Sequence, residues 1–150
     1  MGRLSPDEIP SGATVAIDTV GWIYLLERHP DHYPAARRFF SRVEAGEVQG
    51  VISTLVITEL LVPAYRAGEA RRAAELVRVL QNFPHLQVVD LNAAIAARAA
   101  EVRARYGFRT PDAIHCATAL STGCDAFLTN DAALLRAAEQ LPVFLFTPPR

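Results

Sequence analysis

Four carboxylates are the residues of this sequence best suited to chemistry, because each lies near an expected junction between a strand and a helix. They are Asp18, Glu59, Asp112 and Asp131. Asp18 directly follows an apolar run, and Asp131 follows another after a short polar link. Asp112 lies in the first turn of an expected helix, and Glu59 lies in the helix leaving the second strand. In an open parallel sheet these junctions share one edge, where ligands bind.

Carboxylates gathered at one edge repel one another and resist losing water, unless protons, arginines or a cation offset their charge. An all-oxygen set without a histidine or cysteine cage suits Mg²⁺ or Mn²⁺ rather than zinc. Asp18, Asp112 and Asp131 are the candidate metal ligands. Glu59, whose direction the sequence leaves open, completes the set or orients an attacking water. The reaction best served is phosphodiester hydrolysis, because the ion activates water and neutralises phosphoryl charge.

The same residues also have a purely structural interpretation. All three aspartates stand where a helix is expected to begin, and an aspartate there is favoured by capping and by the helix dipole. Glu59 alone is most often an ordinary helix residue. The functional interpretation therefore depends on the four acids meeting at one edge, not on any one of them.

The hydrophobic pattern predicts the elements that position these acids. Buried strands are expected over residues 14–17, 50–53, 86–89, 125–128 and 143–146. Helices are expected after Asp18 as far as His29, and over 32–46, 54–65, 69–82, 92–106, 110–121 and 131–140, with Thr110 as the cap before Pro111. This alternation indicates an α/β fold with a parallel sheet covered by helices on both faces.

The domain organisation expected from the sequence is simple: an N-terminal arm over residues 1–13 and one domain over 14–150. Two consecutive helices, 54–65 and 69–82, lie between parallel strands, so at least one must cross or project from the sheet. Such a projecting pair is a natural surface for a second copy of the chain or a partner peptide.

Composition excludes several classes of protein. All 15 basic residues are arginine, so P-loop, Schiff-base and lysine-dependent phosphatase chemistry is excluded. The net charge of −1 means that nucleic acid would be bound by a local patch. No apolar run is long enough to span a membrane and no secretory signal is evident, so a cytoplasmic location is expected. The two cysteines form no zinc motif and are expected to be free thiols.

The four acids lie within short motifs that resemble those of PIN-domain nucleases. The motifs are Ile17-Asp18-Thr19, Ile57-Thr58-Glu59-Leu60, the segment from Pro111 to Leu120, and Leu128-Thr129-Asn130-Asp131. They occur in the family's order, and the resemblance covers the chain from about Thr14 to Leu145. The segment from Pro111 to Leu120 is its most specific part.

The resemblance implies a PIN-like three-layer α/β/α sandwich with a five-stranded parallel sheet. It also implies that Asp18, Glu59, Asp112 and Asp131 are the family's acidic quartet, supported by Thr19, Thr129 and Asn130. Small single-domain members are mostly VapC toxins of VapBC toxin–antitoxin pairs. These are Mg²⁺- or Mn²⁺-dependent endoribonucleases, usually homodimers, that a small antitoxin silences.

Two residues bear on how closely this chain follows the family pattern. Val20 stands where the family often has Asn or Ser, so a hydrogen bond that a polar side chain would make in support of the site is expected to be weakened. Pro63, just past Glu59, is expected to alter the tilt of that helix.

Two alternative functions stay open: a PIN-fold protein that binds RNA or a partner without cutting, and a phosphohydrolase for small phosphate esters. The absence of lysine and of a D-x-D motif argues against the second.

Other residues near the expected edge have less specific interpretations. Arg109, three residues before Asp112, is a candidate for binding a substrate phosphate or shielding the acids. His115 is interpreted as a packed or capping histidine rather than a ligand. Trp22 and Tyr24 are interpreted as core or dimer residues rather than base-stacking ones.

Overall fold

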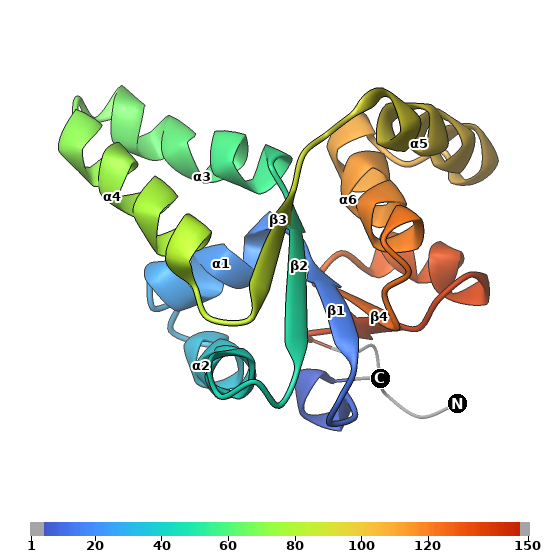
Figure 1. Cartoon of the computed structure of the whole chain (residues 1–150), viewed down its shortest axis with the longest axis horizontal. Coiled ribbons are helices and arrows are strands. Elements are labelled where there is room, and N and C mark those ends of the chain that lie inside the picture. The colour runs from blue at the N-terminus through green and yellow to red at the C-terminus, as the bar shows by residue number, and fades with distance from the viewer. Residues whose placement is uncertain (1–4, 148–150) are drawn as a thin grey trace.

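The computed structural model describes residues 5–147, so the first four residues of the expected arm and the last three of the expected domain lie outside it. Its centre is an all-parallel five-stranded sheet in the order β3-β2-β1-β4-β5 (Figure 1). The strands are β1 (Thr14–Ile17), β2 (Gln49–Ser53), β3 (Leu86–Val89), β4 (Ala126–Thr129) and β5 (Val143–Leu145). The expected α/β fold with a five-stranded parallel sheet is confirmed.

The helices that connect these strands follow the expected segments closely. They are α1 (Thr19–Leu26), α2 (Tyr33–Glu44), α3 (Leu55–Arg66), α4 (Ala70–Asn82), α5 (Ala93–Tyr106) and α6 (Thr110–Ser121), with 3₁₀ helices η1 (Pro6–Glu8) and η2 (Ala132–Glu139). Two expectations need correction. Thr110 is not the cap of α6 but its first residue, after Arg109. The segment expected as a helix over 131–140 forms a tighter 3₁₀ helix, capped by Asp131.

Helices pack on both faces of the sheet and so make three layers. Along β1, Val15 and Ile17 belong to one apolar cluster and Ala16 to the other, because successive side chains of a strand point to opposite faces. Trp22 is fully buried in the first cluster, with its ring centroid 4.3 Å from that of Phe40. Trp22 is therefore a core residue, and no base can stack on it.

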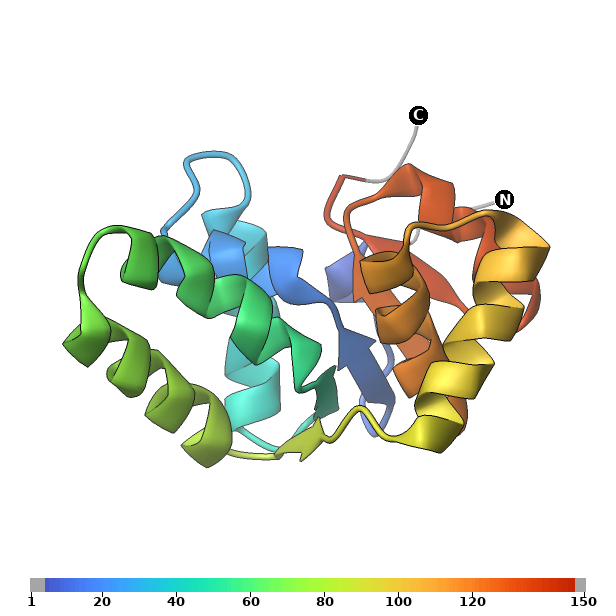
Figure 2. The same ribbon diagram turned by 90° about the horizontal axis from the view of Figure 1, so that it is seen from above.

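The two helices between β2 and β3 project from the body of the molecule. Helix α3 begins at the carboxyl end of β2 and runs outward, and α4 returns along it to the start of β3 (Figures 1 and 2). The projection expected from the sequence is thereby confirmed.

The structure also bears on the two cysteines and on membrane-spanning helices. Cys116 and Cys124 are both free. Within residues 5–147, no helix combines the length and apolarity that crossing a bilayer requires.

Candidate active site

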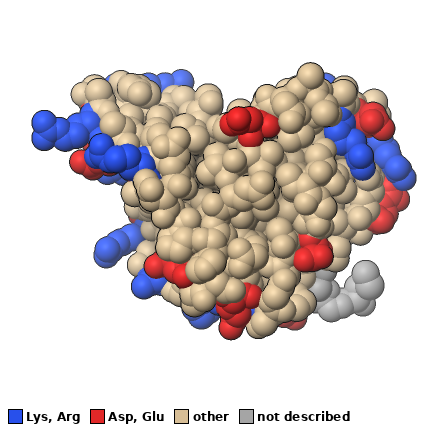
Figure 3. Space-filling model, viewed as in Figure 1, with Lys and Arg blue, Asp and Glu red and all other residues tan. Residues whose placement is uncertain are grey.

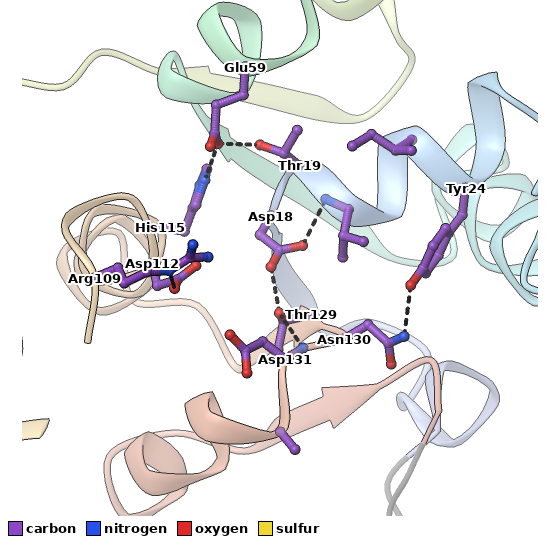
Figure 4. Close-up of a pocket in the computed structure, with 13 residues that line it drawn as sticks. Asp18, Thr19, Tyr24, Glu59, Arg109, Asp112, His115, Thr129, Asn130 and Asp131 are labelled. Atoms are coloured by element: carbon purple, nitrogen blue, oxygen red, sulfur yellow. Dashed lines mark hydrogen bonds and ion pairs between the residues drawn. The ribbon is translucent and has the colours of Figure 1, made fainter. Parts of the chain in front are cut away.

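A cleft of about 550 Å³ lies beyond the carboxyl ends of β1 and β4. All four candidate acids line it, so the structure brings them to one edge of the sheet as the sequence predicted. Arg109, His115 and the supporting residues Thr19, Thr129 and Asn130 line it too (Figure 4). The space-filling view shows a hollow at the upper margin of the molecule with an acidic group in it, and basic side chains at both lateral ends and along the lower left margin (Figure 3).

Asp18 is the most buried of the four acids, with 7% of its surface exposed. It caps α1: Oδ1 accepts a hydrogen bond from the Val20 amide at 3.2 Å, and Oδ2 accepts one from Thr129 Oγ1 at 2.5 Å. Burial raises the pKa of Asp18 to about 6, although the hydrogen bond from Thr129 acts in the opposite direction. An ionised Asp18 is thus held where its charge is poorly solvated, and a nearby cation would stabilise it.

The junction after β4 supplies Asp131 and the residues that fix it. Thr129 Oγ1, besides donating to Asp18, accepts a hydrogen bond from the Asp131 amide at 3.2 Å. Asp131 Oδ1 accepts from the Ala133 amide at 2.9 Å and so caps η2. Asn130 Nδ2 donates to the Tyr24 hydroxyl at 2.8 Å. Thr129 and Asn130 therefore tie this junction to β1 and α1, which agrees with a supporting role.

Glu59 enters the cleft from α3 and is bound through a single oxygen. Its Oε1 accepts hydrogen bonds from Thr19 Oγ1 at 2.6 Å and from His115 Nε2 at 2.8 Å. These bonds, that of His115 foremost, lower the pKa of Glu59, although partial burial opposes them. The direction that the sequence left open is therefore toward the cleft, with the carboxylate ionised near neutral pH.

Asp112 lies in the first turn of α6 and faces an arginine of the same chain. Arg109 Nε lies 3.3 Å from Asp112 Oδ2. The Arg109 side chain is 80% exposed and that of Asp112 only 16%, so the arginine covers the acid from the solvent side. Of the described residues that line the cleft, Arg109 alone carries a permanent positive charge.

His115 was only partly understood from the sequence. It is packed, as expected, with 4% of its surface exposed. Its contact with Glu59 was missed, because that contact depends on how α3 packs against α6. The available signal was its spacing: residues three apart on a helix share a face, so the face that presents Asp112 to the cleft presents His115 as well.

The structural interpretation of the aspartates also holds, since Asp18 and Asp131 both cap helices. Capping alone does not favour burying Asp18 or turning Glu59 inward. The donor set is all oxygen, as a hard divalent cation requires, and each of the three aspartates has an oxygen on the cleft. Within residues 5–147, no three acidic, histidine or cysteine side chains converge closely enough to hold an ion as they stand. The chemistry of the donors nevertheless fits a hard divalent cation.

Comparison with known proteins gives a family model and several similar folds. The model for the PIN domain matches residues 15–140. VapC20 of Mycobacterium tuberculosis, described as a sarcin-ricin loop cleaving toxin, superposes with a TM-score of 0.68 at 19% identity, covering 90% of this chain and 99% of that one. A toxin–antitoxin complex from Klebsiella pneumoniae gives a TM-score of 0.64 at 22% identity, covering 89% and 98%.

A third similar structure is VapBC2 from Rickettsia felis, solved with a DNA fragment from its promoter. It has a TM-score of 0.64 at 16% identity and covers 87% of this chain and 96% of that one. At such identities the likeness shows a shared fold. None of the curated proteins compared with this sequence matches it.

Proposed function

Because the chain belongs to the PIN-domain family, we propose that it is a metal-dependent endoribonuclease and the toxin of a type II toxin–antitoxin pair. The observation that carries the proposal is the meeting of four acids from four elements in one cleft. Burying Asp18 there opposes its ionisation, and such an arrangement is typical of a functional site rather than of a stabilising one.

In this proposal Asp18, Asp112 and Asp131 hold Mg²⁺ or Mn²⁺. The bound ion would supply an activated water and neutralise charge on the phosphodiester, and nucleases of this family generally use divalent ions. Thr129 keeps one oxygen of Asp18 oriented, and Glu59 orients the attacking water. Arg109, exposed beside Asp112, is placed to bind a substrate phosphate.

Val20 keeps the hydrogen bond that caps α1, because its backbone amide donates to Asp18. Its side chain cannot make the additional hydrogen bond that the more usual polar residue could supply. The side chain lines the cleft and gives that wall an apolar surface beside the acids.

We also propose the partners that follow from a toxin. The substrate is RNA, and the regulator is a cognate antitoxin protein, since similar folds occur in toxin–antitoxin complexes. The chain is proposed to form a homodimer and to act in the cytoplasm.

The deciding experiment is RNA cleavage by the antitoxin-free protein with Mn²⁺ or Mg²⁺, beside a chelator control and Asp18→Asn. We expect chelation to abolish cleavage and Asp18→Asn to reduce it by at least about 100-fold, since loss of an outer-sphere partner alone costs 10- to 100-fold. Asp90→Asn is the matched control: Asp90 directly follows β3 at the same edge but does not line the cleft. It should cut like the wild type.

Three other outcomes would change the proposal. Equal cleavage in every lane would point to contamination or a metal-free reaction. RNA binding that chelation leaves intact, with no products formed, would instead support a binding protein. Turnover of a nitrophenyl phosphate that RNA does not inhibit would point to a small-ester phosphohydrolase.

A further inference from the structure

We propose that His115 is a positioning residue that holds Glu59 by one oxygen and leaves the other free to act in the cleft. This inference rests on the proposed nuclease function and assigns a role to a residue outside the acidic quartet. It starts from the Glu59–His115 contact, in which Nε2 lies 2.8 Å from Oε1 (Figure 4).

The first argument is the geometry at Glu59. Thr19 and His115 both bind Oε1, although they come from α1 and α6 and Glu59 comes from α3. Among the described residues, none donates a hydrogen bond to Oε2. Two donors on one oxygen fix the plane and direction of the carboxylate, because rotation would break both charge-assisted bonds. Oε2 is thereby presented to the cleft in one orientation, as a group that must align a water molecule requires.

The second argument is the environment of His115. A carboxylate oxygen only accepts, so Nε2 must be the donor. The other ring nitrogen, Nδ1, is buried without a hydrogen-bond partner. An unpartnered buried nitrogen destabilises the fold, and most proteins avoid it. The one polar contact of this ring is therefore with a candidate catalytic acid, so the ring's hydrogen bonding serves that contact alone.

The third argument is the position of His115 on its helix. His115 lies one turn beyond Asp112 on α6, so a single helix sets the position of a proposed metal ligand and of the group that holds Glu59. Helix α6 packs on β1 and β2 as well as on α3. The distance between Asp112 and Glu59 is thus set by a rigid element and not by loops.

A structural tie between α3 and α6 is the competing explanation, and two variants separate it from positioning. In His115→Gln the amide nitrogen lies as many bonds from Cβ as Nε2 does, so it can still donate to Glu59. In His115→Asn the amide nitrogen corresponds to Nδ1 and falls short. Both variants place a neutral amide in the same buried site, and thermal melting should show similar losses of stability.

If His115 positions Glu59, His115→Asn lowers kcat for RNA about 10- to 100-fold with little change in KM. His115→Gln should recover most of the rate. In a Glu59→Ala background, His115→Asn should cause no further loss, because its effect passes through Glu59. Ring ¹⁵N spectra of the metal-free protein supply an independent measurement: the His115 signals should move on Glu59→Ala and not on Glu75→Ala, a change on the exposed side of α4.

Each outcome decides the question. Wild-type cleavage with an unimpaired His115→Asn variant overturns this inference and leaves the nuclease proposal standing. Equal loss of rate in the Gln and Asn variants shows a structural tie and also overturns it. No cleavage by the wild type overturns the nuclease proposal together with this inference.

Discussion

At the scale of single residues, Asp18 shows a conflict between stability and function. Its folded pKa, about 6, lies above its ordinary value of 3.8. Between these two values the folded state binds more protons than the unfolded state, so stability falls as pH rises through this window. Below it Asp18 is protonated in both states and carries no penalty. Above pH 6 the penalty is complete and corresponds to about 3 kcal/mol.

This conflict predicts that Asp18→Asn stabilises the metal-free protein. At pH 8 we expect the free energy of unfolding to rise by about 1 to 3 kcal/mol, because asparagine carries no buried charge. Its oxygen can still accept from the Val20 amide, and its Nδ2 can donate to the Thr129 hydroxyl instead of accepting from it. At pH 5 the gain should be about half as large. Urea denaturation in chelator at both pH values measures it. A variant less stable than the wild type at pH 8 would show that the site is not strained by Asp18.

The residue scale also shows how far the sequence could lead. Asp18 and Asp131 were predictable because strand ends in a parallel sheet share an edge, whatever the surrounding packing. The direction of Glu59 was not, because it depends on the orientation of α3, a projecting helix. The role of His115 was missed for the same reason: its partner is 56 positions away in the sequence and on a different helix.

At the scale of elements, α3 continues through a proline. Pro63 lies inside the helix and, lacking an N–H, cannot donate to the carbonyl four residues earlier, which is that of Glu59. The missing hydrogen bond therefore lies in the turn of α3 that carries Glu59, a proposed catalytic residue. The helix remains continuous because its buried side packs on the first apolar cluster through Val56, Leu60, Leu61 and Ala64.

Replacing this proline should therefore stabilise the protein. For Pro63→Ala we expect the free energy of unfolding to rise by about 2 kcal/mol. This is the cost of a proline inside a helix, reduced by the conformational freedom that alanine adds to the unfolded chain. Pro34→Ala is the matched control, because Pro34 is also exposed but lies in the first turn of α2, where no donor is needed. Urea denaturation compares the two. Similar stabilities for both variants would contradict a local penalty in α3.

Element boundaries were predictable to within a few residues where caps and apolar runs coincide. The capping asparagine of α5, Asn92, and its terminal Gly107 are examples. The segment after Asp131 was less predictable, because alanine-rich sequence favours a helix, while the short path back to β5 imposes the tighter 3₁₀ geometry.

At the scale of the whole molecule, positive charge is scarce at the proposed site. Of the described residues that line the cleft, four are acids and Arg109 is the only arginine. The net charge is −1. RNA is therefore not drawn to the cleft by a broad basic surface, and the bound cation must supply most of the local attraction.

This distribution predicts weak salt dependence of RNA binding. With one or two phosphate contacts, raising KCl from 50 to 200 mM should weaken affinity less than about tenfold, against several hundredfold for six contacts. Fluorescence anisotropy on the Glu59→Gln protein with Mg²⁺ measures binding while the proposed metal ligands are kept and cleavage is slowed. Arg109→Ala should reduce the salt slope by about 0.7, whereas Arg71→Ala, at the far end of α4, should leave it unchanged. A steep slope that Arg71→Ala reduces would mean that RNA extends along the projecting helices, and the recognition surface would then be far larger than the cleft.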